Sequence, residues 1–228
     1  MKEALKSHMY WPLLFFILLF FGFFACYGIS LSYQHVVSPP EWPFVSDTGA
    51  RSPESTLFTL ILSLASFMVL ITMYLYYKYV IHHHHPTKLN TAAFVIGCIA
   101  SFGVVLVGAF QWTVLLIPHL IGAFTAFIGA MIYGWLIVII SWRQLVPHVH
   151  GMAIVYCRLA LVILGSAAII IMIIFASLMQ VDARYSSTAA ITEWILIYAA
   201  VFFLATLIYD LRRIKSAEVK LVLHGDHV

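Results

Sequence analysis

Residues 153–179 read AIVYCRLALVILGSAAIIIMIIFASLM, a run in which Arg158 carries the only charged side chain. A helix needs about 20 apolar residues to cross the ~30 Å hydrocarbon core of a bilayer. This run is both long enough and apolar enough to do so. It therefore predicts a transmembrane helix.

Further runs of the same character occur along the chain, and the overall composition agrees with them. Hydrophobic residues make up 63% of the 228 positions and charged residues only 9%, which is too little polarity to cover a soluble globular protein. The sequence predicts an all-α, polytopic membrane bundle of six transmembrane helices that forms one domain, residues 1–228. We expect the spans at about 11–31, 56–77, 91–110, 119–141, 153–179 and 191–209, followed by a short basic tail, 210–228.

Lysine and arginine are distributed unequally between the two sides of the predicted bundle. Only Arg51 and Arg184 fall on the side opposite the two termini. Because cytosolic loops carry an excess of positive charge, both termini are predicted to be cytosolic. The opposite end then faces a lumen or the cell exterior, and we call it the lumenal end. The net charge is a modest +3 without a long basic run, which gives no reason to expect nucleic acid as a partner.

Polar residues that are rare elsewhere in the chain gather at the lumenal ends of the predicted spans. Six of them are expected to line a shared lumenal pocket, in which a membrane lipid is the expected ligand: Ser46, Asp47, Glu54, Gln111, His119 and Glu193.

Simpler roles compete with a pocket for two of these acids. Ser52-Pro53-Glu54 is typical of a helix start, with serine as the N-cap, proline in the first turn and an acid at the positive end of the dipole. Asp47 fits an ordinary turn with Gly49. The Asp-Thr-Gly triplet occurs once, whereas an aspartic protease needs two such carboxylates, so we reject that reading.

Glu193 and His119 are harder to explain as surface residues. Glu193 is followed at once by Trp194 and an apolar run, and ionisable residues at that depth usually face the protein interior and have a partner. His119 follows Pro118 at a helix N-terminus, which favours neutral imidazole. His119 is therefore either a structural histidine or, in a lipid hydrolase or acyltransferase, a general base oriented by Glu193 or Asp47. No nucleophile elbow accompanies it, so the enzyme ranks second and no catalytic residue is assigned.

The cytosolic side has its own charged group. Asp210 lies 17 residues beyond Glu193, about 26 Å along a helix, which places it at the opposite membrane face. Arg158 is expected to extend to the interface or to pair with Asp210, and Arg212 and Arg213 follow directly. The tail is expected to attract anionic lipid headgroups or a cytosolic protein. No metal or cofactor site is predicted.

Several of these motifs, taken in order, resemble the damage-regulated autophagy modulator (DRAM) family within the Frag/DRAM/Sfk group of six-span membrane proteins. The motifs are Pro43-Phe-Val-Ser-Asp-Thr-Gly49, Pro53-Glu54-Ser55, Gly108-Ala-Phe-Gln111, His119-Leu-Ile-Gly-Ala123, Cys157-Arg158, Glu193-Trp194 and Asp210. The resemblance implies a non-enzymatic regulator of autophagy that acts through lipid or protein partners. It also implies a lysosomal or endosomal membrane, with the plasma membrane and the Golgi or ER as alternatives.

Overall fold

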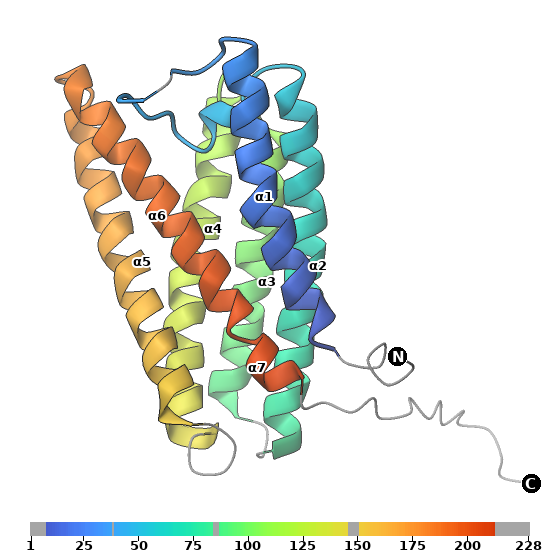
Figure 1. The fold of residues 1–228 in the computed structure, drawn as a ribbon. Helices are drawn as coiled ribbons and strands as arrows, with labels where there is room; N and C mark the ends of the chain where they lie inside the picture. The colour runs from blue at the N-terminus through green and yellow to red at the C-terminus, as the bar shows by residue number, and fades with distance from the viewer. Residues whose placement is uncertain (1–7, 38, 84–86, 146–150, 213–228) are drawn as a thin grey trace, which may run out of the picture.

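The computed structural model describes residues 8–37, 39–83, 87–145 and 151–212, and all regular structure in these segments is helical. Figure 1 shows the long helices side by side in one bundle. They are α1 (Tyr10–Ser32), α2 (Glu54–His83), α3 (Lys88–Ala109), α4 (Leu116–Ile140), α5 (Met152–Leu178), α6 (Ser186–Ala205) and the short α7 (Ile208–Leu211).

Six of the described segments are long and apolar enough to cross a membrane, which confirms the predicted all-α fold with six spans. The helices extend past the predicted runs at several ends. The α2 helix continues to His83 rather than ending at residue 77, and α6 begins at Ser186 rather than residue 191. These added turns are more polar than the spans. A prediction based on apolar runs therefore stops before them, although the backbone continues as helix. The membrane side that each end faces stays a prediction.

The boundary of the C-terminal tail differs from the prediction. A tail was expected to start at residue 210, but Asp210 and Leu211 lie in α7 and are completely buried. Asp210 stays in the bundle because its carboxylate pairs with Arg158 of α5. Arg213 and the rest of the predicted tail lie outside the described residues.

Small residues allow α3 and α4 to approach each other closely. A Cβ atom at Gly103 would lie 2.6 Å from the backbone nitrogen of Ala126, and one at Gly122 would lie 2.7 Å from Cβ of Leu106. Such close backbone approach is the usual way that membrane helices associate, because lipid tails are as apolar as the helices themselves. The α3–α4 hairpin therefore forms one firm side of the bundle.

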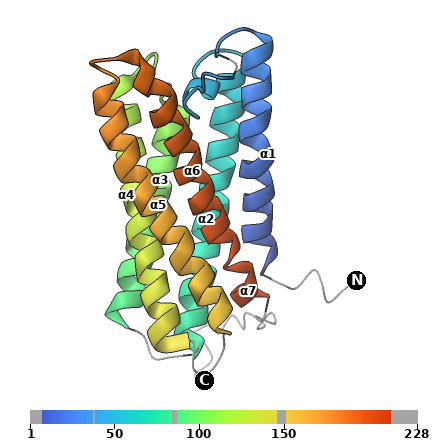
Figure 2. The same cartoon turned by 60° about the vertical axis from the view of Figure 1, so that its left-hand side comes forward.

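The α5–α6 hairpin is tilted across the other helices. Figures 1 and 2 both show the lumenal end of α6 standing apart from α1, with the loop of residues 33–53 filling the space between them. Toward the cytosolic end α6 crosses close to α1. Aromatic rings connect the two helices there, with Phe16 and Phe202 at 5.3 Å and Phe20 and Tyr198 at 5.6 Å between ring centroids.

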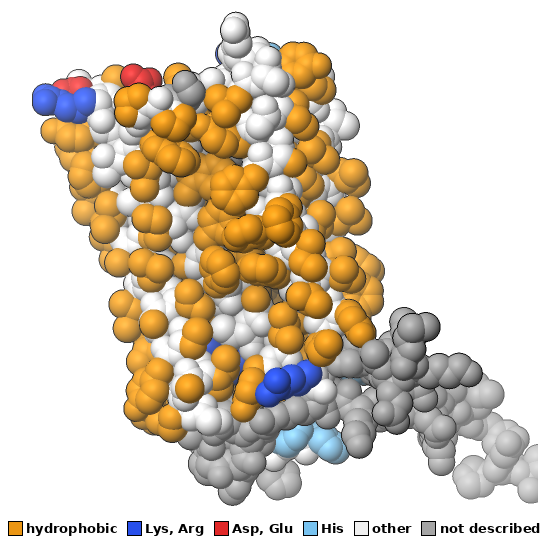
Figure 3. All heavy atoms as spheres, viewed as in Figure 1, with side chains coloured by type: hydrophobic (Ala, Val, Ile, Leu, Met, Phe, Trp, Pro, Cys, Tyr) orange, Lys and Arg blue, Asp and Glu red, His pale blue; other side chains and the backbone are white. Residues whose placement is uncertain are grey.

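The surface follows the predicted membrane arrangement. In Figure 3 hydrophobic side chains cover the middle of the visible face, and the charged side chains lie near its two ends. This distribution suits a membrane protein, because charged groups are costly in the hydrocarbon core.

Candidate functional site

The loop that fills the lumenal end has an ordered core, residues 42–50, which we call the lumenal plug. Asp47–Gly49 form one turn of 3₁₀ helix. Within this core the Phe44 N–H donates to Asp47 Oδ2 at 3.0 Å, and the Thr48 hydroxyl donates to the Val45 carbonyl at 2.7 Å. The turn predicted for Asp47 is thus present, and it shapes the plug.

The lumenal plug is fastened to α6 by four hydrogen bonds. Glu193 Oε2 accepts from the Val45 N–H at 2.5 Å, and the indole N–H of Trp194 donates to the Pro43 carbonyl at 3.0 Å. At the edge of the plug, the Trp42 N–H donates to the hydroxyl of Ser187 at 3.2 Å. The Ser46 N–H also bonds to the Glu193 carboxylate. Glu193 therefore satisfies the orphan N–H groups of a turn that would otherwise be buried without partners.

The other side of the lumenal plug is held by α2 and by the connection between α3 and α4. The Thr113 hydroxyl donates to the Ala50 carbonyl at 3.0 Å. Gly49 lies directly on Phe58 of α2, where an added Cβ would be only 2.2 Å from the ring. Only glycine fits this contact, so the plug is seated by shape as well as by hydrogen bonds.

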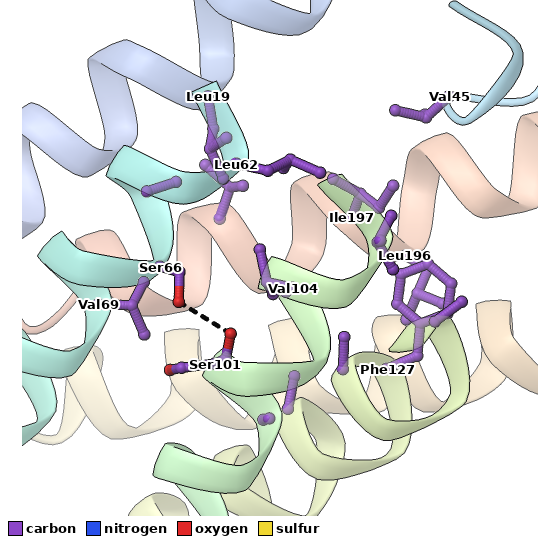
Figure 4. Close-up of a pocket in the computed structure, with 18 of the residues that line it drawn as sticks. Leu19, Val45, Leu62, Ser66, Val69, Ser101, Val104, Phe127, Leu196 and Ile197 are labelled. Atoms are coloured by element: carbon purple, nitrogen blue, oxygen red, sulfur yellow. Dashed lines mark hydrogen bonds between the residues drawn. The ribbon is translucent and has the colours of Figure 1, made fainter. Parts of the chain in front are cut away.

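A cavity of about 140 Å³ lies beneath the lumenal plug, along the centre of the bundle. Figure 4 shows part of its wall, with Val45 of the plug at one end and Ser66 and Ser101 facing each other from α2 and α3. Most of the lining is aliphatic or aromatic. The polar lining residues are Ser46, His119 and Glu193 at the lumenal end and Ser66 and Ser101 deeper in the bundle.

Three of the six residues predicted for a shared lumenal pocket thus line this cavity, namely Ser46, His119 and Glu193. Asp47 lies on the outer side of the lumenal plug, where it lines an open cleft together with Trp42 and Trp112. The plug separates the cleft from the cavity. The predicted pocket is therefore two spaces, one apolar and internal and one polar and exposed.

Glu54 and Gln111 do not line the cavity. Glu54 is completely buried, and its Oε1 accepts from Ser30 at 3.3 Å and lies 2.6 Å from Nδ1 of His35. Glu54 is the first residue of α2, as the predicted helix start requires, and its carboxylate connects the start of α2 to the end of α1. Gln111 donates to the Thr59 hydroxyl at 3.4 Å, which connects the end of α3 to α2.

His119 connects α4 to the end of α3. Its Nδ1 lies 2.7 Å from the Phe110 carbonyl, and because a carbonyl only accepts, this nitrogen carries the proton. Among the described residues no hydrogen bond joins His119 to Glu193 or to Asp47. The base and its orienting acid of the enzyme alternative are therefore not assembled here.

Asp47 is a titratable residue of this site that lies outside the membrane-spanning helices. Burial raises the pKa of its carboxyl above the ordinary value, and the hydrogen bond from Phe44, the Trp112 side chain and the nearby His119 act in the opposite direction. Desolvation is the largest of these effects. The folded protein therefore holds the Asp47 proton more tightly than an unfolded chain does.

At the cytosolic end, the predicted pairing of Arg158 with Asp210 is present, and both side chains are completely buried. The guanidinium also donates to the Ser141 hydroxyl at 2.8 Å and to the Thr206 hydroxyl at 2.9 Å. A fourth contact goes to the Thr206 carbonyl, at 3.2 Å, beside the break between α6 and α7. We call Arg158, Asp210, Ser141 and Thr206 the cytosolic node.

The sequence analysis did not identify several residues that make the contacts described above. Among them are Ser30, His35, Thr113, Ser141 and Thr206. Serine and threonine are common in membrane helices, and nothing local distinguishes the few that contact a buried charge. The signal for His35 was its place in the same loop as the lumenal plug.

The described residues also bear on cofactor chemistry. In these segments no three His, Cys, Asp or Glu side chains gather in a way that would hold a metal ion. What the arrangement offers is an apolar space with hydrogen-bonding groups at one end, which suits an amphiphile.

Comparison with known proteins identifies the family of this chain. Residues 7–214 match the profile of the Frag1/DRAM/Sfk1/Cwh43P N-terminal domain. The chain belongs to this family. The described lumenal plug, cavity and cytosolic node all fall inside the matched region of the Frag1/DRAM/Sfk1/Cwh43P domain.

Curated relatives from this family are similar along most of their length. DNA damage-regulated autophagy modulator protein 1 of Homo sapiens is 28% identical over 90% of this chain and 91% of its own. DNA damage-regulated autophagy modulator protein 2 of Mus musculus is 31% identical over 90% and 84%. The modulator of macroautophagy TMEM150B of Danio rerio is 31% identical over 77% and 73%. No solved structure matches the chain.

Proposed function

We propose that this chain is a non-enzymatic modulator of autophagy in lysosomal or endosomal membranes, and that it acts by holding a membrane lipid or by recruiting a protein partner. The relatives named as autophagy modulators support the process. The observation that carries the proposed mode of action is the apolar cavity under the lumenal plug, lined at its lumenal end by His119 and Glu193.

The enzyme alternative receives less support from the geometry. A lipid hydrolase or acyltransferase needs a base in contact with its orienting acid. Here His119 bonds to a backbone carbonyl, and Glu193 bonds to the backbone of the lumenal plug. Both side chains are used to hold helices and loop together.

A cell experiment tests the proposal. Cells that lack the protein are compared with cells that express wild type, Glu193→Ala or Glu41→Gln, each tagged for microscopy. We expect the protein on lysosomal or endosomal membranes, and autophagic flux restored by wild type and by Glu41→Gln, which changes an exposed residue of the same loop. Glu193→Ala should restore less. Equal flux with and without the protein would overturn the proposal.

A second experiment distinguishes a membrane lipid from a cytosolic protein as the partner. Arg212 is exposed and stacks over the Tyr209 ring at 4.3 Å, at the start of the basic tail. Neutralising Arg212, Arg213, Lys215 and Lys220 removes about 1 kcal/mol of attraction to anionic lipid per residue. Loss of a co-purified cytosolic protein would favour recruitment. Unchanged recovery, together with reduced flux in Glu193→Ala, would favour the lipid.

A further inference from the structure

We infer that the central cavity takes the end of one hydrocarbon chain from a lipid of the lumenal leaflet, and that this chain enters sideways between α4 and α6. The inference rests on the proposed function and specifies its ligand, its route and the residues that it meets.

The size and lining of the cavity select the ligand class. An apolar protein cavity of about 150 Å³ stays dry and admits a benzene-sized ligand. At about 140 Å³ this cavity holds a chain end and excludes a whole lipid. Apart from Ser66 and Ser101, the deep wall consists of apolar side chains such as Leu62, Val69 and Met73, which offer no partner to a charged group.

The lumenal plug closes the route from the aqueous side. Val45 and Ser46 form the inner surface of the plug and line the cavity, whereas Asp47 lines the outer cleft. The bonds from Val45 to Glu193 and from Trp194 to Pro43 hold it against α6. A water-soluble ligand from the lumen would have to break these bonds.

Two walls of the cavity are closed toward the lipid as well. Every residue of α1 and α2 that lines the cavity is buried, including Leu19 at 6% exposure and Leu62 at 5%. By contrast, Ala123 of α4 and Ile197 of α6 are only half-buried, and each lies one turn deeper than His119 and Glu193 respectively. Val104 and Val107 of α3 are half-buried lining residues as well, but α3 packs closely on α4 at Gly103 and is hydrogen-bonded to α2 through the Gly108 carbonyl. We therefore assign the opening to the space between α4 and α6, at the depth of Ala123 and Ile197.

The position of α5 limits this opening on its cytosolic side. Ala168 of α5 packs with Met131 and Leu196, and this small cluster covers the space between α4 and α6 near the membrane centre. Figure 4 shows Phe127 beside Leu196 at this level. A chain that enters above the cluster passes His119 and Glu193, whose polar atoms lie where the ester and headgroup region of the lipid would be.

The cavity also contains a polar atom that the protein leaves unsatisfied. The Ser101 hydroxyl is buried, at 2% exposure for the residue, and among the described residues it has no hydrogen-bond partner, although the Ser66 hydroxyl donates to the Ser101 carbonyl at 2.8 Å. A hydrocarbon chain end neither donates nor accepts a hydrogen bond, so this hydroxyl does not select the ligand. Ser66 and Ser101 serve instead as positions in the deep wall where labelling would report how far the chain end reaches.

The test uses photolabelling in nanodiscs. The full-length protein is reconstituted with phosphatidylcholine that carries a diazirine near the end of one acyl chain, irradiated, digested and mapped by mass spectrometry. Bulk lipid labels exposed positions such as Ile170 and Phe102 in any case. Labelling of the buried residues Ser66, Val69 or Ser101 is expected only if the chain end enters the cavity.

Variants then locate the entrance. Ala123→Phe fills the half-buried position at the opening, and Ala200→Phe fills a second cavity position on α6. The matched control is Ala167→Phe, an exposed site on α5. We expect loss of labelling at Ser66 and Ser101 in the two cavity variants and unchanged labelling in the control, with melting temperatures measured in the same discs.

Each outcome decides the inference. Wild-type labelling confined to exposed residues would overturn it without recourse to any variant. Labelling of the cavity that persists in both filled variants, at wild-type melting temperatures, would overturn the route between α4 and α6. Wild-type cavity labelling that is lost in Ala123→Phe, combined with unchanged autophagic flux in Ala123→Phe cells, would uphold the ligand and reject lipid holding as the mode of action.

Discussion

Among the buried ionisable groups, Arg158 and Glu193 stand at opposite ends of the bundle, and the protein satisfies them differently. At the cytosolic node Arg158 meets an opposite charge, two hydroxyls and a carbonyl, all from other helical segments. At the lumenal end Glu193 meets only backbone N–H groups of the lumenal plug. The first arrangement joins helices to helices, whereas the second joins a helix to a loop.

The difference indicates which end of the molecule can open. Separating the cytosolic node would break a completely buried ion pair, which is strongly unfavourable. Releasing the lumenal plug breaks a few hydrogen bonds and exposes Glu193 to water. We therefore expect the lumenal end, next to the cavity, to open more readily than the cytosolic end.

The largest effect is expected at the cytosolic node. Arg158→Ala removes the partner of a completely buried Asp210, and breaking a buried pair in this way costs about 3–5 kcal/mol of unfolding free energy. The control is Arg184→Ala, which removes an exposed pair with Asp182 and should cost less than about 1 kcal/mol. Thermal unfolding in a mild detergent measures both. Equal losses would refute the rigid role of the node.

A smaller effect is expected from the seat of the lumenal plug. Gly49→Ala places a Cβ 2.2 Å from the Phe58 ring, and overpacking of this kind costs about 1–3 kcal/mol. Gly28→Ala is the matched control, because nothing lies within 4 Å of its added Cβ and alanine favours helix by about 1 kcal/mol. The two substitutions should change the melting temperature in opposite directions. A Gly49→Ala protein as stable as wild type would mean that the plug is not seated on Phe58.

The smallest effect concerns the charge of Asp47. Because burial raises the pKa of Asp47 in the folded state, the unfolded chain loses this proton first as pH rises. The contribution of Asp47 to stability is therefore greatest below the ordinary carboxyl pKa and declines as pH rises through the raised one. Asp47→Asn removes this decline, so its stability relative to wild type should increase between about pH 4 and about pH 7.

The readout for Asp47→Asn is the difference in melting temperature from wild type across that range. Glu41→Gln, at an exposed position in the same loop, is the control. A difference that stays constant with pH, or that changes in the opposite direction, would show that burial does not dominate at Asp47.

Sequence reasoning recovered the features that depend on local pattern. Apolar length gave the six spans, and the depth of Glu193 in an apolar run predicted that it is buried with a partner. For Arg158, pairing with Asp210 was one of two expectations, the other being extension to the interface. Helix geometry alone placed Asp210 at the cytosolic end, where it meets Arg158. These inferences succeed because periodicity and charge burial constrain each residue wherever its neighbours lie.

Contacts between distant segments could not be predicted in the same way. The Val45 N–H and Glu193 are separated by 148 positions, and no pattern in either segment identifies the other. Glu54 begins α2, as Ser52-Pro53-Glu54 predicted, but nothing in that motif indicates that its carboxylate contacts Ser30 and His35. The contact of Val45 with Glu193 and those of Glu54 both depend on how the helices pack against one another.

The most direct test of the central claim is amide hydrogen exchange at Val45 and Ser46 in nanodiscs, measured for wild type, Glu193→Gln and Glu193→Ala. If Glu193 holds the lumenal plug, Glu193→Ala should greatly accelerate exchange of these two amides while the α3–α4 hairpin keeps its protection. Glu193→Gln, whose amide oxygen still accepts, should lie between the two. Unchanged protection of Val45 and Ser46 in Glu193→Ala would contradict the account.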